Sequence, residues 1–248
     1  STIAEPRQGL LTGDSQLFVR QWWEVSGNRT EFACESRELA RASRARWFPY
    51  NKGGEFRKWY GNHEHVVNWE DDGRAVRTFG AQTGGRVRSR PQNVEYYFKP
   101  SVSWSNVSSG SPAFRSYPPG FIAAGSTGDG VYPPSQELRI NLLGILNSSV
   151  THELLAAIAP TITFNVGTIA NLPIVEPRSE DELGSAVREL SGIARDDWNQ
   201  TETSWGFEFN PLVVKGVPSV EESGRRRQES IDATAERARL LEVRNNEA

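Results

Sequence analysis

The spacing of apolar residues changes near residue 134 of this 248-residue chain. Residues 47–134 carry short runs typical of strands, separated by turn signals such as Asp-Asp-Gly, Gly-Gly and Pro-Pro-Gly. The runs are VVNW, RAVRTF, VEYYF and FIAA. After Pro134 the apolar residues recur at helical spacing, which predicts one helix in SQELRINLLGILNSS and a second that Thr151 opens and Pro160 stops. We therefore expect a strand-and-loop region followed by helices.

The two ends of the chain have more varied patterns. Residues 16–25, QLFVRQWWEV, fit either a strand or a short helix, whereas the helix formers of ESRELARASRAR at 35–46 predict a short exposed helix. TITFNVGTIANLPIVEP at 161–177 predicts a strand, a glycine turn and an extended exit. Beyond it, capping-box patterns at Ser179 and Ser219 each precede apolar residues on one helical face, so we expect two further helices.

These elements predict an α+β fold in two parts. Residues 1–178 form a compact mixed α/β domain with a β-rich basic core, and residues 179–248 form a helical C-terminal segment. The proline-flanked exit near Pro177 sets the boundary. The chain has no methionine and its last helical pattern stops abruptly, so we expect it to be truncated or to continue in a longer protein.

Charge is segregated along the chain although the formal net charge is only −3. Residues 41–99 hold twelve Lys/Arg against six Asp/Glu, a net of +6, and residues 179–248 hold nine against fifteen, a net of −6. This distribution indicates a region that faces a polyanion beside a solvated or partner-facing helical region. Ordinary solvated faces are the alternative explanation.

The sequence lacks the residues needed for disulfides, metal sites and membrane segments. The single cysteine, Cys34, excludes an internal disulfide, and with three histidines a closed zinc site is not expected. His63 and His65 would share one face of a strand, but no third ligand accompanies them, so we predict no metal. No membrane-length apolar stretch or signal peptide is present, and we expect a cytoplasmic protein.

Catalytic motifs are also missing. A DNA methyltransferase needs a glycine-rich site for its methyl donor and, for amino methylation, an Asn or Asp followed by Pro-Pro and an aromatic residue, and the sequence has neither. It also has no recognisable nucleophile set. We therefore expect that this chain alone is not catalytic and holds no cofactor.

One stretch, WFPYNKGGEFRKWYGNHEHVVNW at 47–69, combines seven large aromatic residues with cations and hydrogen-bonding side chains. Such a mixture suits a surface that grips and reads a polyanion. The alternative is a Trp-rich hairpin whose aromatic side chains fill a core. We call residues 47–69 the aromatic segment.

An ordered series of motifs closely resembles the downstream half of BREX-type (PglX-like) adenine-specific DNA methyltransferases of bacterial phage defence. The series spans residues 9–174 and consists of GLLTGDSQLFVRQWWEV, RWFPYNKGGEFRKWYGNHEHVVNW, YYFKPSVSWSNVSS, PPGFIAAGS, LLGILNSSV and PTITFNVGTIANLPI. SEDELGSAVRELSGIARDDWNQTETSW and RLLEVRNNEA are similar to the helical segments that follow in that family. The VGTIANLPI exit is also similar to the end of recognition domains in related restriction-modification proteins.

The resemblance implies a target-recognition domain that grips duplex DNA and selects the site. A separate upstream domain would bind S-adenosylmethionine and methylate adenine N6, and other phage-defence proteins are possible partners. Two alternatives stay open: a non-enzymatic protein-interaction module of a defence complex, and a carbohydrate-binding β domain.

For DNA recognition we expect three kinds of contact. Six cations would anchor phosphates, with one or two of the arginines reading guanine instead: Lys52, Arg57, Lys58, Arg86, Arg88 and Arg90. Asn62, Gln82 and Asn106 are candidate readers of base edges. Trp59 or Tyr60 would support strand distortion while the catalytic domain captures the flipped adenine.

Overall fold

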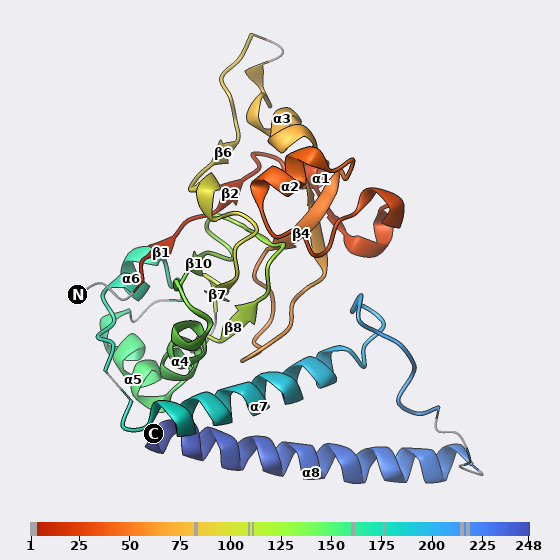
Figure 1. Cartoon of the computed structure of the whole chain (residues 1–248), viewed down its shortest axis with the longest axis vertical. Helices are drawn as coiled ribbons and strands as arrows, with labels where there is room; N and C mark the ends of the chain where they lie inside the picture. The colour runs from red at the N-terminus through yellow and green to blue at the C-terminus, as the bar shows by residue number, and fades with distance from the viewer. Residues whose placement is uncertain are drawn as a thin grey trace.

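The computed structural model describes residues 4–81, 84–108, 110, 112–159, 162–175, 177–213, 216 and 219–248. Short strands in three sheets form a body, and two long helices run along one side of it (Figure 1). Helices and sheets are both present, which confirms the predicted α+β class. The domain boundary after residue 178 stays a prediction.

Two four-stranded sheets and one two-stranded sheet make up the body. The first has the order β1-β10-β7-β8, with strands Pro6–Arg7, Gly130–Val131, Ser101–Trp104 and Phe114–Tyr117. The second has the order β3-β5-β4-β9, with strands Val19–Gln21, His65–Asn68, Trp47–Asn51 and Ile122–Ala123. The third pairs β2 (Leu10–Leu11) with β6 (Arg90–Pro91). The strands predicted in VVNW and FIAA are thus confirmed as β5 and β9.

Short helices connect and cover the strands. They are α1 (Ser15–Phe18), α2 (Arg37–Ala42), α3 (Glu70–Arg77), α4 (Gln136–Leu146), α5 (Ser149–Ile158) and α6 (Val166–Ala170). α2 confirms the helix predicted at 35–46, and α4 and α5 confirm the pair predicted after Pro134. α5 begins earlier than expected, because the Ser148 hydroxyl accepts the Thr151 N–H at 3.2 Å and caps it. Residues 16–25 contain both of the expected types, the end of α1 and strand β3.

Three local predictions are wrong in type. Residues 74–77 of RAVRTF belong to α3, and residues 71–73 before them take left-handed φ values of 51°, 59° and 75° and close a turn. VEYYF opens with a 3-10 turn after Asn93, which has a φ of 49°. The expected glycine turn in VGTIA is helix α6, capped by Asn165, whose side chain accepts the Thr168 N–H at 3.0 Å.

Two hydrophobic clusters stabilise the body. One gathers side chains from the second sheet and its surroundings: Leu10, Phe48, Val67, Trp69, Phe98 and Ile122. The other packs Trp59, Trp104 and Phe114 against helix α4 and the first of the two long helices. Trp59 and Trp69 of the aromatic segment are only 4% and 1% exposed, so for these two side chains the core interpretation is correct.

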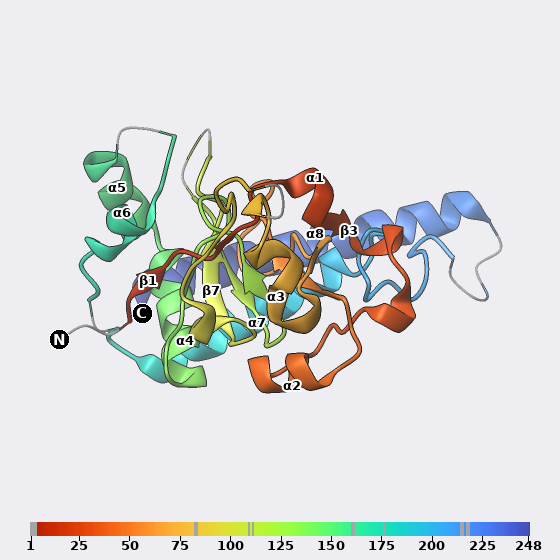
Figure 2. The same cartoon turned by 90° about the horizontal axis from the view of Figure 1, so that it is seen from above.

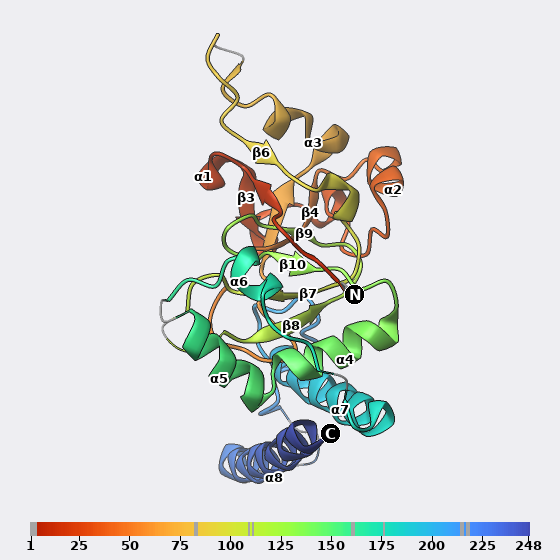
Figure 3. The same cartoon turned by 90° about the vertical axis from the view of Figure 1, so that its left-hand side faces the viewer.

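The two long helices are α7 (Glu180–Trp198) and α8 (Val220–Glu247). Ser179 and Ser219 cap them by accepting the N–H groups of Glu182 and Glu222, as the sequence predicts. α7 buries Leu183, Val187 and Leu190 against the body. α8 lies side by side with α7 and farther from the sheets (Figures 1 and 3), and both helices pass behind the sheets when the molecule is seen from above (Figure 2). The helical pair therefore occupies one end of the molecule.

Candidate nucleic-acid interface

A basic loop lies at the end of the molecule opposite α8 (Figures 1 and 3). We define the basic loop as residues 84–90, which leave the α3 region and return to the body as β6. Residues 73–94 around it hold five arginines and no acidic residue. The loop is held at its base because the Arg88 N–H donates to the Phe79 carbonyl at 2.9 Å, and because Leu11 pairs with Arg90.

Arg86, Arg88 and Arg90 are exposed on this loop. The Arg88 guanidinium lies 5.1 Å from the centre of the Phe79 ring. None of the three forms an ion pair with the part of the chain that the structure describes. The arginines of α3 differ, because Arg74 and Arg77 pair with acidic neighbours. Three exposed cations without counter-ions on one loop suit contact with phosphates.

Lys52 follows strand β4 and is also exposed. It lines a groove of about 290 Å³ together with residues 10–15 and 125–127. β2, in the wall of this groove, is the partner strand of β6 at the base of the basic loop. The structure therefore brings Lys52, Arg86, Arg88 and Arg90 to one side of the body.

Asn106 lies in the interior beneath that groove. Its side chain is 3% exposed and donates to the Asp129 carboxylate at 2.7 Å. Its carbonyl oxygen accepts the Asp129 N–H at 3.3 Å. Both ends of the amide are thus engaged in the fold. Gln82, the third candidate base reader beside Asn62, lies outside the described residues.

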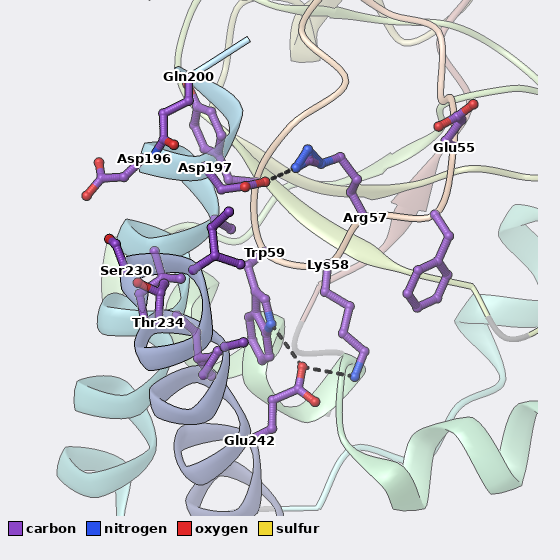
Figure 4. Close-up of a pocket in the computed structure, with 18 of the residues that line it drawn as sticks. Glu55, Arg57, Lys58, Trp59, Asp196, Asp197, Gln200, Ser230, Thr234 and Glu242 are labelled. Atoms are coloured by element: carbon purple, nitrogen blue, oxygen red, sulfur yellow. Dashed lines mark hydrogen bonds and ion pairs between the residues drawn. The ribbon is translucent and has the colours of Figure 1, made fainter. Parts of the chain in front are cut away.

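Two other predicted cations contact the long helices. Arg57 forms an ion pair with Asp197 of α7, and its guanidinium lies 5.1 Å from the centre of the Trp198 ring. Lys58 Nζ lies 3.3 Å from Glu242 Oε1 of α8, an oxygen that also accepts the Trp59 indole N–H at 3.3 Å (Figure 4). These three side chains attach the aromatic segment to the helical pair, along a cleft of about 840 Å³.

The remaining predicted residues of the aromatic segment shape its turn. Trp59 and Asn62 have positive φ values of 73° and 60°. The Asn62 side chain is 7% exposed and donates to the Glu55 carbonyl at 2.9 Å. Tyr60 packs its ring 4.4 Å from the ring of His63. In the described structure these groups stabilise the loop and its contacts with the rest of the chain.

His63 is the centre of an aromatic cage. Its ring lies within 6 Å of four aromatic rings, those of Tyr60, Tyr117, Phe121 and Trp205. Both ring nitrogens are buried and have no hydrogen-bond partner in the described structure. Burial lowers the pKa of His63 to about 3, and the nearby Arg115 cation contributes to that shift. The imidazole is therefore neutral at physiological pH.

Two known proteins are similar to this chain over most of its length, whereas no protein-family model matches it. The chain is 35% identical over 212 residues to the adenine-specific methyltransferase PglX of Lacticaseibacillus casei (strain Zhang), covering 86% of this chain and 17% of that protein. It is 34% identical over 209 residues to the adenine-specific methyltransferase BrxX of Escherichia coli O9:H4 (strain HS), covering 83% and 16%. The chain is homologous to one segment of the BREX-type adenine-specific methyltransferases. It spans about one sixth of the length of these relatives.

Sequence patterns missed the acidic partners of the aromatic segment. Asp197 follows Ala194 by three positions on the predicted apolar face of α7, and Glu242 adjoins Leu241 on that of α8. The sequence did contain one signal for these contacts. An acidic residue beside an apolar helical face lies at the rim of a packing surface, where it can meet a cation of the neighbouring segment. Which cation it would meet depends on the tertiary fold.

Within the described ranges, no three His, Cys, Asp or Glu side chains gather in a way that could hold a metal ion. No helix in those ranges combines the length and apolar character needed to cross a membrane.

Proposed function

We propose that this segment recognises duplex DNA for an adenine-N6 methyltransferase of phage defence. The observation that carries the proposal is the basic loop, where three exposed arginines lack counter-ions in the described structure. The similarity to two adenine-specific methyltransferases supports a methyltransferase context. S-adenosylmethionine would bind to a separate catalytic domain of the same protein, which works in the cytoplasm.

Arg86, Arg88 and Arg90 anchor DNA phosphates in this proposal, and one or two of them read guanine through the major groove. Lys52 lies on the same side of the body and adds a fourth cation. Arg57, Lys58 and Trp59 hold the helical pair instead, because their polar groups contact Asp197 and Glu242. Asn62 stabilises the turn of the aromatic segment, and Asn106 binds Asp129, which accepts N–H groups from both walls of the Lys52 groove.

Binding of duplex DNA to the full-length protein over a salt series tests this function. Replacing Arg86, Arg88 and Arg90 together by alanine should weaken binding, and the slope of log K against log salt should fall by about 1 to 3, since each arginine that contacts a phosphate contributes about 0.9. A matched control replaces three arginines of α8, Arg225, Arg226 and Arg239, which are exposed and pair within their own helix. Equal affinity and slope for the loop variant and the wild type would contradict the proposal.

A further inference from the structure

The groove beside Lys52 is built from two similar segments far apart in the sequence. GLLTGD covers residues 9–14 and GSTGDG covers residues 125–130. Leu10 bridges Ala124 in parallel, and the Gly125 N–H donates to the Leu10 carbonyl at 3.0 Å. Tyr50 also lines the groove, and its hydroxyl donates to the same Leu10 carbonyl at 2.8 Å. The two segments therefore form facing walls.

A buried carboxylate fixes both walls. Asp129 is 0% exposed and accepts the N–H of Gly9 and the N–H of Ser126, each at 3.3 Å, beside the Asn106 amide. Burial raises the pKa of this carboxyl group, while the hydrogen bonds from Asn106, Gly9 and Ser126 oppose that shift. A buried acid is costly unless its oxygens are hydrogen-bonded, so these bonds are needed for the fold and hold the groove open in advance.

Asn51 holds the segment that carries Lys52. Its side-chain amide donates to the Gly128 carbonyl at 2.9 Å, and its carbonyl oxygen accepts the Gly53 N–H at 3.1 Å. The residues on both sides of Lys52 are thereby tied to the 125–130 wall. The lysine extends from a fixed backbone.

The groups that line the groove are mostly hydrogen-bond donors without partners. Thr12 is only 4% exposed, yet its hydroxyl has no hydrogen bond to any described residue. The same holds for the hydroxyls of Ser15, Ser126 and Thr127, and Lys52 forms no ion pair there. Asp14 is the one carboxylate among the lining residues, and it accepts the Leu17 N–H at 3.0 Å as the cap of α1. These hydroxyls are therefore free to donate hydrogen bonds to a ligand in the groove.

The groove adjoins the basic loop. Gly13 has a φ of 77°, and a Cβ atom there would lie 2.8 Å from the backbone carbonyl of Arg88. Only a glycine lets these two segments of the backbone approach this closely without strain. The backbone of the basic loop therefore lies against the wall of the groove that contains Gly13.

We propose that this groove binds one phosphate of the DNA backbone and so fixes the register of the protein on its site. Lys52 supplies the positive charge, and the hydroxyls of Thr12 and Thr127 donate hydrogen bonds to the phosphate oxygens. A phosphate carries only acceptors, which matches a groove rich in unused donors. This inference rests on the proposed recognition of DNA.

The test uses the full-length protein and duplexes in which one phosphate at a time is a neutral methylphosphonate. With the wild type, neutralising one backbone position should weaken binding about tenfold. Lys52→Ala and Thr12→Val should each weaken binding to unmodified DNA. In Lys52→Ala, a methylphosphonate at that one position should cause no further loss of affinity, whereas methylphosphonates at other positions should weaken binding as they do with the wild type. Lys99→Ala, which removes another exposed lysine, should retain the wild-type profile.

The outcomes separate the two proposals. If the triple arginine variant loses DNA binding while Lys52→Ala keeps the wild-type affinity and profile, the groove is not a phosphate site and DNA recognition stands. If neither variant changes binding, both proposals fail.

Inorganic phosphate, titrated alone into the wild type and Lys52→Ala, tests whether the groove is instead a site for a free anion. If phosphate stabilises the wild type against thermal unfolding as much as duplex DNA does, or more, the assignment to the DNA backbone is overturned. Thermal unfolding of Thr12→Val checks that its fold is intact, and Lys52→Ala is informative independently because Lys52 is exposed.

Discussion

At the scale of single residues, His63 links the pH of the solution to the stability of the fold. Its pKa is about 3 in the folded chain, whereas an unfolded histidine titrates near 6.5. Between these values the unfolded chain binds more protons than the folded chain. The free energy of unfolding therefore falls as the pH drops from about 6.5 toward 3, by up to about 1.4 kcal/mol per pH unit from this group.

Chemical unfolding at pH 7 and pH 5 measures this effect. We expect the wild type to lose about 2 kcal/mol from His63 over that interval, and His63→Phe to lose correspondingly less because phenylalanine keeps the aromatic contacts and cannot be protonated. Burial lowers the pKa of His65 and His152 as well, so the comparison between wild type and variant isolates His63. If the free energy of unfolding depends on pH identically in both proteins, the aromatic cage does not exclude the protonated form of His63.

At the scale of elements, Glu242 joins α8 to the aromatic segment through Lys58 and the Trp59 indole. Lys58→Glu places two like charges together, so we expect faster amide hydrogen exchange in the last three turns of α8. The free energy of unfolding should fall by no more than about 1 kcal/mol, because the Glu242 side chain is 40% exposed and solvent screens the pair. Adding Glu242→Lys should restore part of the protection by reforming the ion pair, although not the indole hydrogen bond. Arg239→Glu serves as the control, since among the described residues Arg239 pairs with Glu236 of its own helix alone. Exchange in Lys58→Glu that matches the wild type would mean that this contact does not hold α8.

Elements with strong local signals were predictable from the sequence. The caps at Ser179 and Ser219 lie three residues before the N–H groups they accept, so the sequence alone specifies them. RAVRTF was assigned wrongly because its two large apolar residues, Val76 and Phe79, are three residues apart, as on a helix, and do not alternate. Asn93 caused a similar error, since its left-handed backbone begins a turn that composition does not reveal.

The candidate site was predictable only where charge and exposure coincide. The cations of the basic loop stand in a stretch without acids, and the structure leaves them exposed. Arg57 and Lys58 looked equivalent in the sequence, but their partners lie 140 and 184 residues away. No local pattern could reveal that those two charges are neutralised by helices packed beside them.

At the scale of the whole molecule, positive and negative charge occupy opposite ends. The basic loop projects from one end of the body, and the helical pair, within a region of net charge −6, lies at the other (Figure 1). DNA that binds along the loop and the Lys52 groove would lie away from α7 and α8. Repulsion from the acidic helices would then favour one orientation of the duplex.

The most direct measurement maps methylated adenines in cells that carry the full-length gene, before and after exchange of residues 78–93 for the aligned residues of the L. casei PglX. This exchange replaces the basic loop and leaves strands β4 and β5 intact. If the loop recognises DNA, methylation should move to a different sequence or lose its sequence preference while the protein is still produced. Methylation of the same sequence at the same level would contradict recognition of DNA by this loop.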